Sequence, residues 1–454
     1  MVASARTNGA DLAAAELIDA GVSMSFGIPG IQNLAMYAGL ERAGARAVLI
    51  ANEESAAFAA AGVFAASGGV EIACVNLIGG PGITHALAGI TIAYDQQVPM
   101  LVLTAGIKRG PAHASHRFQL HDVDNLGVLG AVTKAATTPK SVEEIPRVLR
   151  EALRVALTPP YGPVAVEIPS DMLSTFVPAS ELAKLQSASR LPLPTMAPRL
   201  PSDSPVLPRH DEALAADSKA LYSAVSDECR EKLVVVSDPG LCSGLAAPLG
   251  ERHELLLPPQ DAAVGFAIPT AIGAALVRAR GSTPGTPAPP VLAIVDAQAL
   301  LMTGAELTTA ATERLQLILL VPTWAGQSTA PPFHFGASVD LEAFAAGFGF
   351  PYVPMQQSLG QTIRAALAQG TTAHAPCVIA EWRLSAPQPT PLPLVDVGAT
   401  GRALYARLSA AGVGLLVGCP SSREAHATML AVEQAAAAAG EARPLRVLIA
   451  TDDQ

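Results

Sequence analysis

Two adjacent acids and a glycine-rich turn are the residues of this 454-residue chain whose types and spacing best suit chemistry. Glu53 and Glu54 follow an apolar run and precede an alanine-rich one. A carboxylate tuned by burial can act as an acid or a base, but acids in the first turn of a helix also favour its dipole without any chemistry. Gly79-Gly-Pro-Gly82 suits an anion at a helix N-terminus, and equally a tight strand-to-helix turn.

Histidines and cysteines give weaker indications. His113, His116 and His121 cluster, but no sulfur or carboxylate completes a set of four ligands, so a polar loop is favoured over a zinc site. The five cysteines are odd in number and scattered, which predicts reduced, buried thiols in a cytosol-like compartment. They are Cys74, Cys229, Cys242, Cys377 and Cys419.

Strands that alternate with helices must position these residues. Near-continuous apolar runs predict strands buried on both faces, and the alternation predicts a parallel sheet with helices on its two faces. In the first part of the chain the predicted strands are 22–26, 47–51, 72–77, 100–105 and 163–168, and the predicted helices are 12–20, 31–43, 53–67, 83–94 and 147–156. A second unit has predicted strands at 233–237, 291–295, 316–321 and 378–382 and helices at 264–279 and 304–314.

Proline-rich stretches separate these units, and the C-terminal part resembles the N-terminal part. The segment Ala20 to Pro29 matches Ala411 to Pro420, and Val48 to Ser55 matches Val447 to Gln454. We predict a first domain over 1–180, a Pro-rich linker over 181–215, a second domain over 216–385 and a partial repeat of the first domain over 394–454. One strand–helix–strand is too little to form a core alone, so the repeat must pack on something.

The composition disfavours several kinds of partner. The chain has 29 Lys and Arg residues against 39 Asp and Glu residues, so its net charge is −10, and half of its residues are hydrophobic. An acidic chain without runs of Lys or Arg disfavours nucleic acid and anionic membrane surfaces. No apolar stretch reaches the roughly 18 residues of a membrane span, and no secretory signal is visible. We therefore expect a cytoplasmic protein without nucleic-acid or membrane partners.

The order of the motifs resembles the thiamine diphosphate (ThDP) enzymes, nearest the acetolactate synthases and 2-oxoacid decarboxylases. The segments similar to the family's pyrimidine-binding domain are Gly27-Ile-Pro-Gly30, Asn52 to Gly62 and Gly80 to Gly89. The segments similar to its diphosphate-binding domain are Val264 to Leu276 and Met302 to Leu307. The resemblance implies an α/β fold with two ThDP-fold units, each a parallel sheet flanked by helices. The linker then stands where the family's central domain is usual, and the C-terminal partial repeat is an addition.

The resemblance also implies roles for particular residues. In the family a glutamate hydrogen-bonds the aminopyrimidine ring of ThDP, and Glu53 occupies that position, with Asn52 where a histidine is common. Gln119 fits the same template as a second catalytic residue. The residues that would line the cofactor are Gly27, Pro29, Gly80, Pro81, Gly82 and Gly265. Family members build their sites between two subunits, which implies a dimer or a larger homo-oligomer.

The motif for the cation that holds the diphosphate departs from the family. There an Asp in a Gly-Asp-Gly turn and a later Asn bind a divalent cation, usually Mg²⁺. Here Ala297 and Thr323 fall at those positions, and neither supplies a carboxylate or amide oxygen. Asp296 is a weak substitute, because it lies one residue early and a one-residue slip in a strand reverses the side chain. Since Mg²⁺ demands near-octahedral oxygen geometry, we expect no metal site and no tight ThDP binding.

Three hypotheses for function follow. The first is an inactive descendant of a ThDP enzyme, kept as a structural, self-assembling or regulatory homo-oligomer, with the C-terminal repeat docked on another subunit. The second is an active ThDP-dependent lyase or carboligase on a 2-oxoacid such as pyruvate, with ThDP and Mg²⁺ as cofactors and an unorthodox metal site. The third is that the emptied cleft binds a different small ligand. The first explains why the core motifs persist while the metal motif has decayed.

Overall fold

The structure is a computed structural model that describes most of the chain in two compact units. The described residues are 7–109, 120–178, 192–194, 215–258, 263–280, 289–324, 339–370, 377–385, 415–418, 432 and 446–449. The larger unit is Met1–Pro322 with Leu341–Trp382, and the smaller is Thr323–Asp340 with Arg383–Gln454. Two six-stranded sheets belong to the larger unit. We call the described residues around them the first module (7–178) and the second module (215–382).

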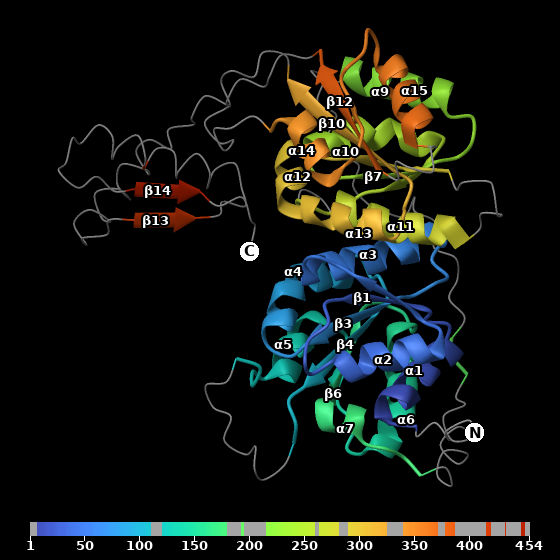
Figure 1. Cartoon of the computed structure of the whole chain (residues 1–454), viewed down its shortest axis with the longest axis vertical. Coiled ribbons are helices and arrows are strands. Elements are labelled where there is room, and N and C mark those ends of the chain that lie inside the picture. Colours follow the sequence, from blue (N-terminus) through green and yellow to red (C-terminus); the bar gives the residue numbers. More distant parts are fainter. Residues whose placement is uncertain are drawn as a thin grey trace. The chain divides into compact units, whose positions relative to one another are not determined.

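The first module is a parallel sheet between two helix layers (Figure 1). Its strand order is β2-β1-β3-β4-β6-β5. Helices α1, α2 and α6 pack together on one face, and α3, α4 and α5 on the other. The strands are β1 (Met24–Gly27), β2 (Arg46–Leu49), β3 (Cys74–Ile78), β4 (Leu101–Gly106), β5 (Ala136–Thr137) and β6 (Val164–Pro169). The helices are α1 (Gly9–Asp19), α2 (Leu34–Ala43), α3 (Glu53–Ala66), α4 (Pro81–Asp95), α5 (Asn125–Val132), α6 (Ile145–Ala156) and α7 (Ser170–Ser174), with the short 3₁₀ helix η2 (Val142–Glu144).

The second module repeats this design with strand order β11-β12-β10-β9-β7-β8. Its strands are β7 (Val234–Ser237), β8 (Glu254–Leu256), β9 (Val291–Ile294), β10 (Leu317–Trp324), β11 (Tyr352–Val353) and β12 (Cys377–Leu384). Its helices are α9 (Ala215–Glu228), α10 (Leu241–Ala246), α11 (Ala267–Arg280), α12 (Ala297–Thr303), α13 (Leu307–Thr312), α14 (Leu341–Phe348) and α15 (Leu359–Gly370), with η5 (Ala247–Glu251) and η6 (Gly304–Glu306). Within the described part of the chain, no helix is both long and apolar enough to cross a membrane.

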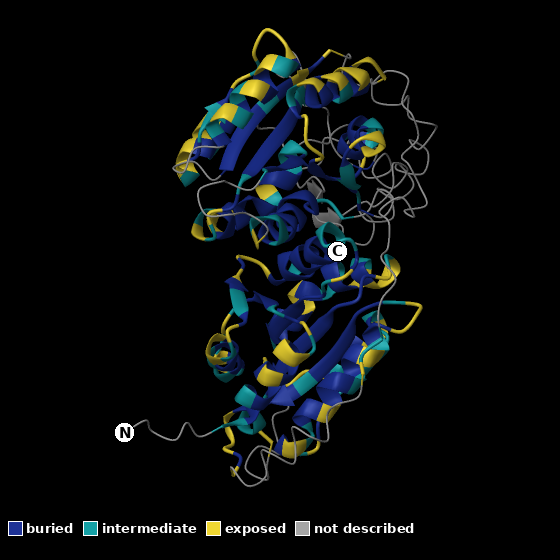
Figure 2. Ribbon diagram, turned by 90° about the vertical axis from the view of Figure 1, so that its right-hand side faces the viewer, coloured by how far each residue is buried: buried dark blue, intermediate teal, exposed yellow. Residues whose placement is uncertain are grey.

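The sheets form the cores of both modules, as the near-continuous apolar runs predicted. Every residue of β1, β4, β7 and β9 is buried. Figure 2 shows the strands as buried and the exposed residues on the outer helix surfaces and loops. Each predicted strand overlaps an observed one with ends within three residues. The predicted fold class of two parallel-sheet units flanked by helices is confirmed.

Two predicted helix starts differ from the structure for clear local reasons, and one helix was not predicted at all. The predicted helix 31–43 begins at Leu34, because the Asn33 side chain first closes a turn by accepting the Gly30 N–H at 2.7 Å. The predicted helix 264–279 begins at Ala267, since Gly265 has φ +88°, which a helix does not allow. The helix predicted at 304–314 is preceded by α12, which was not predicted.

The two modules meet along α3 and α11, where glycine lets the backbones touch. A Cβ added to Gly62 would lie 2.1 Å from the Thr270 carbonyl oxygen. A Cβ added to Gly273 would lie 1.9 Å from the Ala59 carbonyl oxygen. No side chain fits at such distances, so the close approach of the two helices depends on these glycines.

The helices α3 and α11 run in the same direction. Near their starts, the rings of Phe58 and Phe266 pack edge to face with centroids 5.5 Å apart. At the other end, Nη1 of Arg280, the last residue of α11, lies 2.7 Å from Oε2 of Glu71, which follows the end of α3. The N-terminus of α3, which carries Glu53, therefore lies at the same end of the helix pair as the N-terminus of α11.

Two parallel strands are described near the C-terminus, β13 (Leu415–Gly418) and β14 (Arg446–Ile449). Leu415 pairs with Arg446, as Met24 pairs with Arg46 in the first module. This register makes Arg446 the counterpart of Arg46, one residue away from the alignment by sequence identity. The repeat over 394–454 stays a prediction, since most of it lies outside the described residues, as does most of the predicted linker over 181–215.

Candidate functional site

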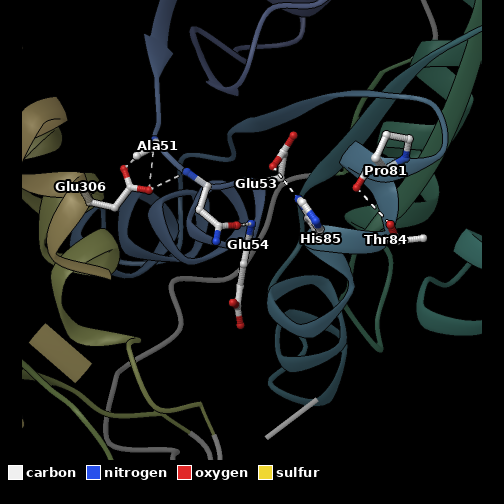
Figure 3. A network of polar contacts seen from close by, with 8 residues as sticks. Ala51, Glu53, Glu54, Pro81, Thr84, His85 and Glu306 are labelled. Atoms are coloured by element: carbon white, nitrogen blue, oxygen red, sulfur yellow. Dashed lines mark hydrogen bonds and ion pairs between the residues drawn. The ribbon is translucent and has the colours of Figure 1, made fainter. Parts of the chain in front are cut away.

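Glu53 is the first residue of α3, and its carboxylate is buried. The preceding Asn52 caps the helix, since its side chain accepts the Glu54 N–H at 3.0 Å. Glu53 is 9% exposed, and its Oε2 lies 3.3 Å from Nδ1 of His85 on α4, whose side chain is 64% exposed. Figure 3 shows the two side chains facing each other. The position of Glu53 in the first helical turn is favourable for the helix dipole. The dipole alone does not require that the carboxylate be buried or face an imidazole.

The turn before α4 is a tight strand-to-helix turn with few free donors. Gly80 is the N-cap at φ +72°, and a Cβ there would lie 2.3 Å from the Leu120 carbonyl oxygen. The Gly79 N–H donates to the Ala105 carbonyl and the Gly80 N–H to Asn125 Oδ1, at 3.1 and 3.0 Å. Pro81 has no N–H. Three of the positions that would cradle an anion are thus already used or lack a donor.

The structure brings one glycine of this turn to Glu53. A Cβ added to Gly82 would lie 3.5 Å from Glu53 Oε1, an ordinary van der Waals contact. The resemblance implied that Glu53 and Gly82 belong to one site, and the two residues are in contact in the structure. Gln119 lies outside the described residues, so its proximity to Glu53 stays a prediction.

The turn after β1 is formed around Gly27. A Cβ on Gly27 would lie 2.1 Å from the Asn76 carbonyl oxygen and 2.8 Å from the Tyr37 hydroxyl oxygen, so no side chain fits. Pro29 is exposed. Burial raises the pKa of Tyr37 above its ordinary value, and the charge of Glu53 raises it further. The Tyr37 phenol therefore stays protonated beside the acid. The sequence reading missed it, although α2 places it one turn past the Asn33 that closes this loop.

The second module contributes a buried acid, Asp238, directly after β7. Its Oδ1 accepts the Ala267 N–H at 2.9 Å and its Oδ2 the Asp296 N–H at 3.2 Å. Burial raises the pKa of Asp238 to about 7, and the nearby charge of Asp296 contributes in the same direction. The sequence reading missed this residue. The available signal was an acid directly after an apolar strand, at the sheet edge where α/β proteins bind ligands.

The two positions that the resemblance assigns to the metal do not fit a cation. Ala297 is the first residue of α12 and carries only a methyl group. Thr323 lies in β10, half-buried, with a hydroxyl in place of an amide. Asp296, the suggested substitute, is the N-cap of α12, because its Oδ1 accepts the Gln298 N–H at 2.8 Å. A helix, α12, therefore begins where the resemblance places the metal-binding turn.

No other metal site replaces it among the described residues. There, no three His, Cys, Asp or Glu side chains lie together as a metal would require. His121 Nδ1 is 2.9 Å from the Gly79 carbonyl oxygen, while His113 and His116 lie outside this part of the chain. The four cysteines with described positions, Cys74, Cys229, Cys242 and Cys377, are free and buried, as predicted. Burial raises the pKa of Cys229 to about 11, so its thiol is not activated.

Gly265 and Glu306 lie on the side of the candidate site that the second module forms. Gly265 has a positive φ, and a Cβ there would lie 2.8 Å from Thr303 Cγ2 on α12. Glu306 lies in a motif that the resemblance used, but its contacts were not predicted. It is 1% exposed, and its carboxylate accepts the N–H groups of Ala51 and Asn52 at 3.1 and 3.0 Å (Figure 3). An acid of the second module thus holds the backbone that leads into Glu53.

Comparison with known proteins relates the N-terminal part of the chain to one family. Residues 7–127 match the family described as "Thiamine pyrophosphate enzyme, N-terminal TPP binding domain". The acetolactate synthase isozyme 3 large subunit of Escherichia coli (strain K12) is 35% identical over 176 residues, which cover 38% of this chain and 29% of that protein. The acetolactate synthase large subunit of Haemophilus influenzae is 34% identical over 169 residues, 37% of this chain and 29% of that protein. The chain therefore matches less than a third of the length of these relatives.

Comparison with solved structures extends the likeness to both modules. The ThDP-dependent 4-hydroxybenzoylformate decarboxylase of Rhodococcus jostii RHA1 superposes with a TM-score of 0.62 at 15% identity, over 83% of this chain and 99% of that chain. At this identity the likeness shows the fold alone. The N-terminal part of the chain is thus similar to the acetolactate synthases and matches the N-terminal domain of the ThDP enzymes, and the fold of the two modules is that of a ThDP-dependent decarboxylase.

Proposed function

We propose that this protein is a ThDP-enzyme relative that has lost Mg²⁺ and ThDP binding, and catalysis with them, and that it serves as a structural or regulatory homo-oligomer. The observation that carries the proposal is the start of α12. Ala297 stands where the family has a metal-ligating Asp, and the neighbouring Asp296 caps the helix. Neither Ala297 nor Thr323 offers the carboxylate or amide oxygen that Mg²⁺ prefers, and Oδ1 of Asp296 already accepts the Gln298 N–H.

Electrostatics supports the same proposal. Asp238 and Asp296 follow the ends of the adjacent strands β7 and β9. The Asp296 N–H donates to the Asp238 carboxylate. A diphosphate brought to this edge meets the Asp296 carboxylate, which has the same sign of charge, and Asp238, whose burial already disfavours a negative charge there. Without a cation between them, like charges and the lost hydration both oppose binding.

The side of the candidate site that the first module forms, with Glu53 and Gly82, favours the second candidate function. That function is an active lyase or carboligase on a 2-oxoacid such as pyruvate. Glu53 is buried at the position where the family binds the aminopyrimidine, and Gly82 leaves room beside it. ThDP, if bound there, would supply the nucleophilic carbon that such reactions need. The side of the site in the first module fits that cofactor, whereas the side in the second module lacks ligands for the cation, and this difference favours the loss of binding.

Calorimetric titration of the full chain with ThDP and Mg²⁺ tests the proposed loss. We expect no binding tighter than about 1 mM, equivalent to about −4 kcal/mol, and no consumption of pyruvate. The E. coli isozyme 3 large subunit, titrated in the same buffer, controls for active cofactor. Micromolar binding that Glu53→Gln abolishes, together with pyruvate turnover, would establish the active alternative instead.

The proposed assembly has its own test. The strands β13 and β14 form a two-stranded sheet, and an isolated pair of strands is at best marginally stable in water. We propose that residues 394–454 dock on another copy of the chain. Removing them should lower the oligomer mass measured by light scattering. An unchanged oligomer mass would reject the docking.

A further inference from the structure

Polar side chains gather on one face of the first sheet, under α2. Strands β1 and β3 pair in parallel, with Ser25 opposite Cys74 and Gly27 opposite Asn76. Since residues two apart in a strand point to the same face, these four positions share one face of the sheet. Helix α2 lies against α1 (Figure 1) and brings the Tyr37 hydroxyl to Gly27, 2.8 Å from where a Cβ would lie. This face is therefore the one that α2 covers.

The polar groups on this face are buried. Ser25 and Asn76 are each 1% exposed, and Tyr37 is 9% exposed. Within the described part of the chain, neither Oη of Tyr37 nor Nδ2 of Asn76 has a hydrogen-bond partner. The Ser25 hydroxyl has the Cys74 thiol beside it, which is a weak hydrogen-bonding group. Folded proteins pair nearly all such buried groups, either with protein atoms or with ordered water, because an unmade hydrogen bond is costly.

The orientation of the Asn76 amide follows from the turn before α2. Oδ1 of Asn33 accepts the Gly30 N–H at 2.7 Å, and Nδ2 of Asn33 donates to the Ile28 carbonyl at 3.2 Å. The Asn33 amide is thereby fixed, and it also directs its Nδ2 to Oδ1 of Asn76 at 3.5 Å. A reversed Asn76 amide would place N–H groups against each other. Nδ2 of Asn76 is therefore the atom that points away from Asn33 as a donor.

The separation of Tyr37 and Asn76 suits one bridging water. Gly27 and Asn76 are paired residues of adjacent strands, which lie about 4.8 Å apart. The Tyr37 hydroxyl lies against Gly27, and the Asn76 amide extends from the neighbouring position. The two groups do not bond each other directly. Polar groups that face each other just beyond direct bonding distance are commonly joined by water.

We propose that the first module binds a buried water molecule between α2 and the sheet, held by the Tyr37 hydroxyl and the Asn76 amide. The ligand must accept from the Asn76 N–H groups and exchange a hydrogen bond with a hydroxyl, and water does both. An anion is opposed by Glu53, whose negative charge raises the pKa of Tyr37. A cation is opposed by the Asn76 donors. A buried water makes about three hydrogen bonds, and the Ser25 hydroxyl on the same face supplies the third partner.

The bound water holds the turn between β1 and α2 on the sheet. It fixes Asn76, and Asn76 accepts from Asn33, which closes the turn. Gly27 and Pro29, which the resemblance assigned to the cofactor, belong to this same turn. The water therefore supports one edge of the candidate site from within the first module, whether or not a cofactor binds.

A crystal structure of the full chain, at a resolution that shows ordered water, tests the site directly. We expect density for one water at hydrogen-bond distance, about 2.7–3.2 Å, from both Oη of Tyr37 and Nδ2 of Asn76. A dry site, or a protein group in the place of the water, would overturn the proposal.

Urea unfolding of Tyr37→Phe tests the same site in solution. If the water is bound, the variant deprives it of a partner and should raise the unfolding equilibrium constant by about three- to tenfold. If the site is dry, the variant removes a hydroxyl that lacks a partner, so stability should stay the same or increase. Tyr94→Phe is the matched control, because Tyr94 is 44% exposed and its variant should be neutral. A Tyr37→Phe variant as stable as the wild type would contradict the bound water.

A double-mutant cycle tests whether Tyr37 and Asn76 share one water. Asn76→Leu removes both donors at similar size. If one water joins the two residues, either substitution breaks the bridge. The double variant should then unfold less readily than the product of the two single effects, by about threefold or more in the equilibrium constant. Where Asn76→Leu does not fold, Ser25→Ala takes its place in the cycle. Multiplicative effects would show that the residues do not share a ligand.

Discussion

Replacing Gly273 with alanine should destabilise the protein by about 3 kcal/mol or more, because the new methyl group has no space. Its Cβ would lie 1.9 Å from the Ala59 carbonyl oxygen and 3.0 Å from the Val63 nitrogen, both of them backbone atoms of α3. A backbone cannot rotate away as a side chain can, so α3 and α11 must separate. The gain in helix propensity, up to about 1 kcal/mol, does not compensate.

Urea unfolding of the full chain measures this effect, with Gly244→Ala as the matched control. Gly244 lies inside α10, and an added Cβ there meets nothing within 4 Å. The control should be neutral or stabilising. If both variants shift the midpoint by the same amount, the close packing of α3 on α11 is not the structure in solution. Because α3 carries Glu53, Gly273→Ala should also loosen the candidate site.

The free energy of unfolding should fall as pH rises from about 4 to about 7, because of Asp238. Burial raises its pKa from 3.8 to about 7 in the folded protein. In this window the folded state holds a proton that the unfolded chain has released, so the unfolded state binds fewer protons and stability declines with pH. A shift of about three units corresponds to roughly 4 kcal/mol in all.

Asp238→Asn removes this titration, so the variant should gain stability relative to wild type between pH 4 and pH 8. Urea unfolding across that range measures the difference. Glu228→Gln is the control with the opposite sign. The Arg364 guanidinium lowers the pKa of Glu228, so its contribution is present above its unfolded pKa and is lost toward acid pH. If Asp238→Asn parallels wild type at every pH, Asp238 is not the buried acid described here.

The predictions that succeeded rest on local patterns. Apolar runs buried on both faces indicated the strands, and two acids before an alanine-rich run indicated the start of α3 at Glu53. Such signals depend on neighbours within a few residues, where hydrogen bonding and helix capping act. The mismatch at Ala297 was equally visible, because a methyl group offers no ligand in any fold. The helix α12 that begins there was not predicted, although its cap, Asp296, is a local signal two residues from the N–H that it accepts.

Contacts between distant residues required the tertiary structure. His85 meets Glu53 because α4 packs beside α3, Asp238 meets Asp296 because β7 pairs with β9, and Glu306 reaches Ala51 across 255 positions of sequence. No local pattern encodes these pairs, because the path of the chain decides which residues become neighbours. Residue types and spacing thus predicted the fold and showed that Ala297 and Thr323 lack carboxylate and amide oxygens, whereas packing alone determined which acids are buried and which backbone they hold.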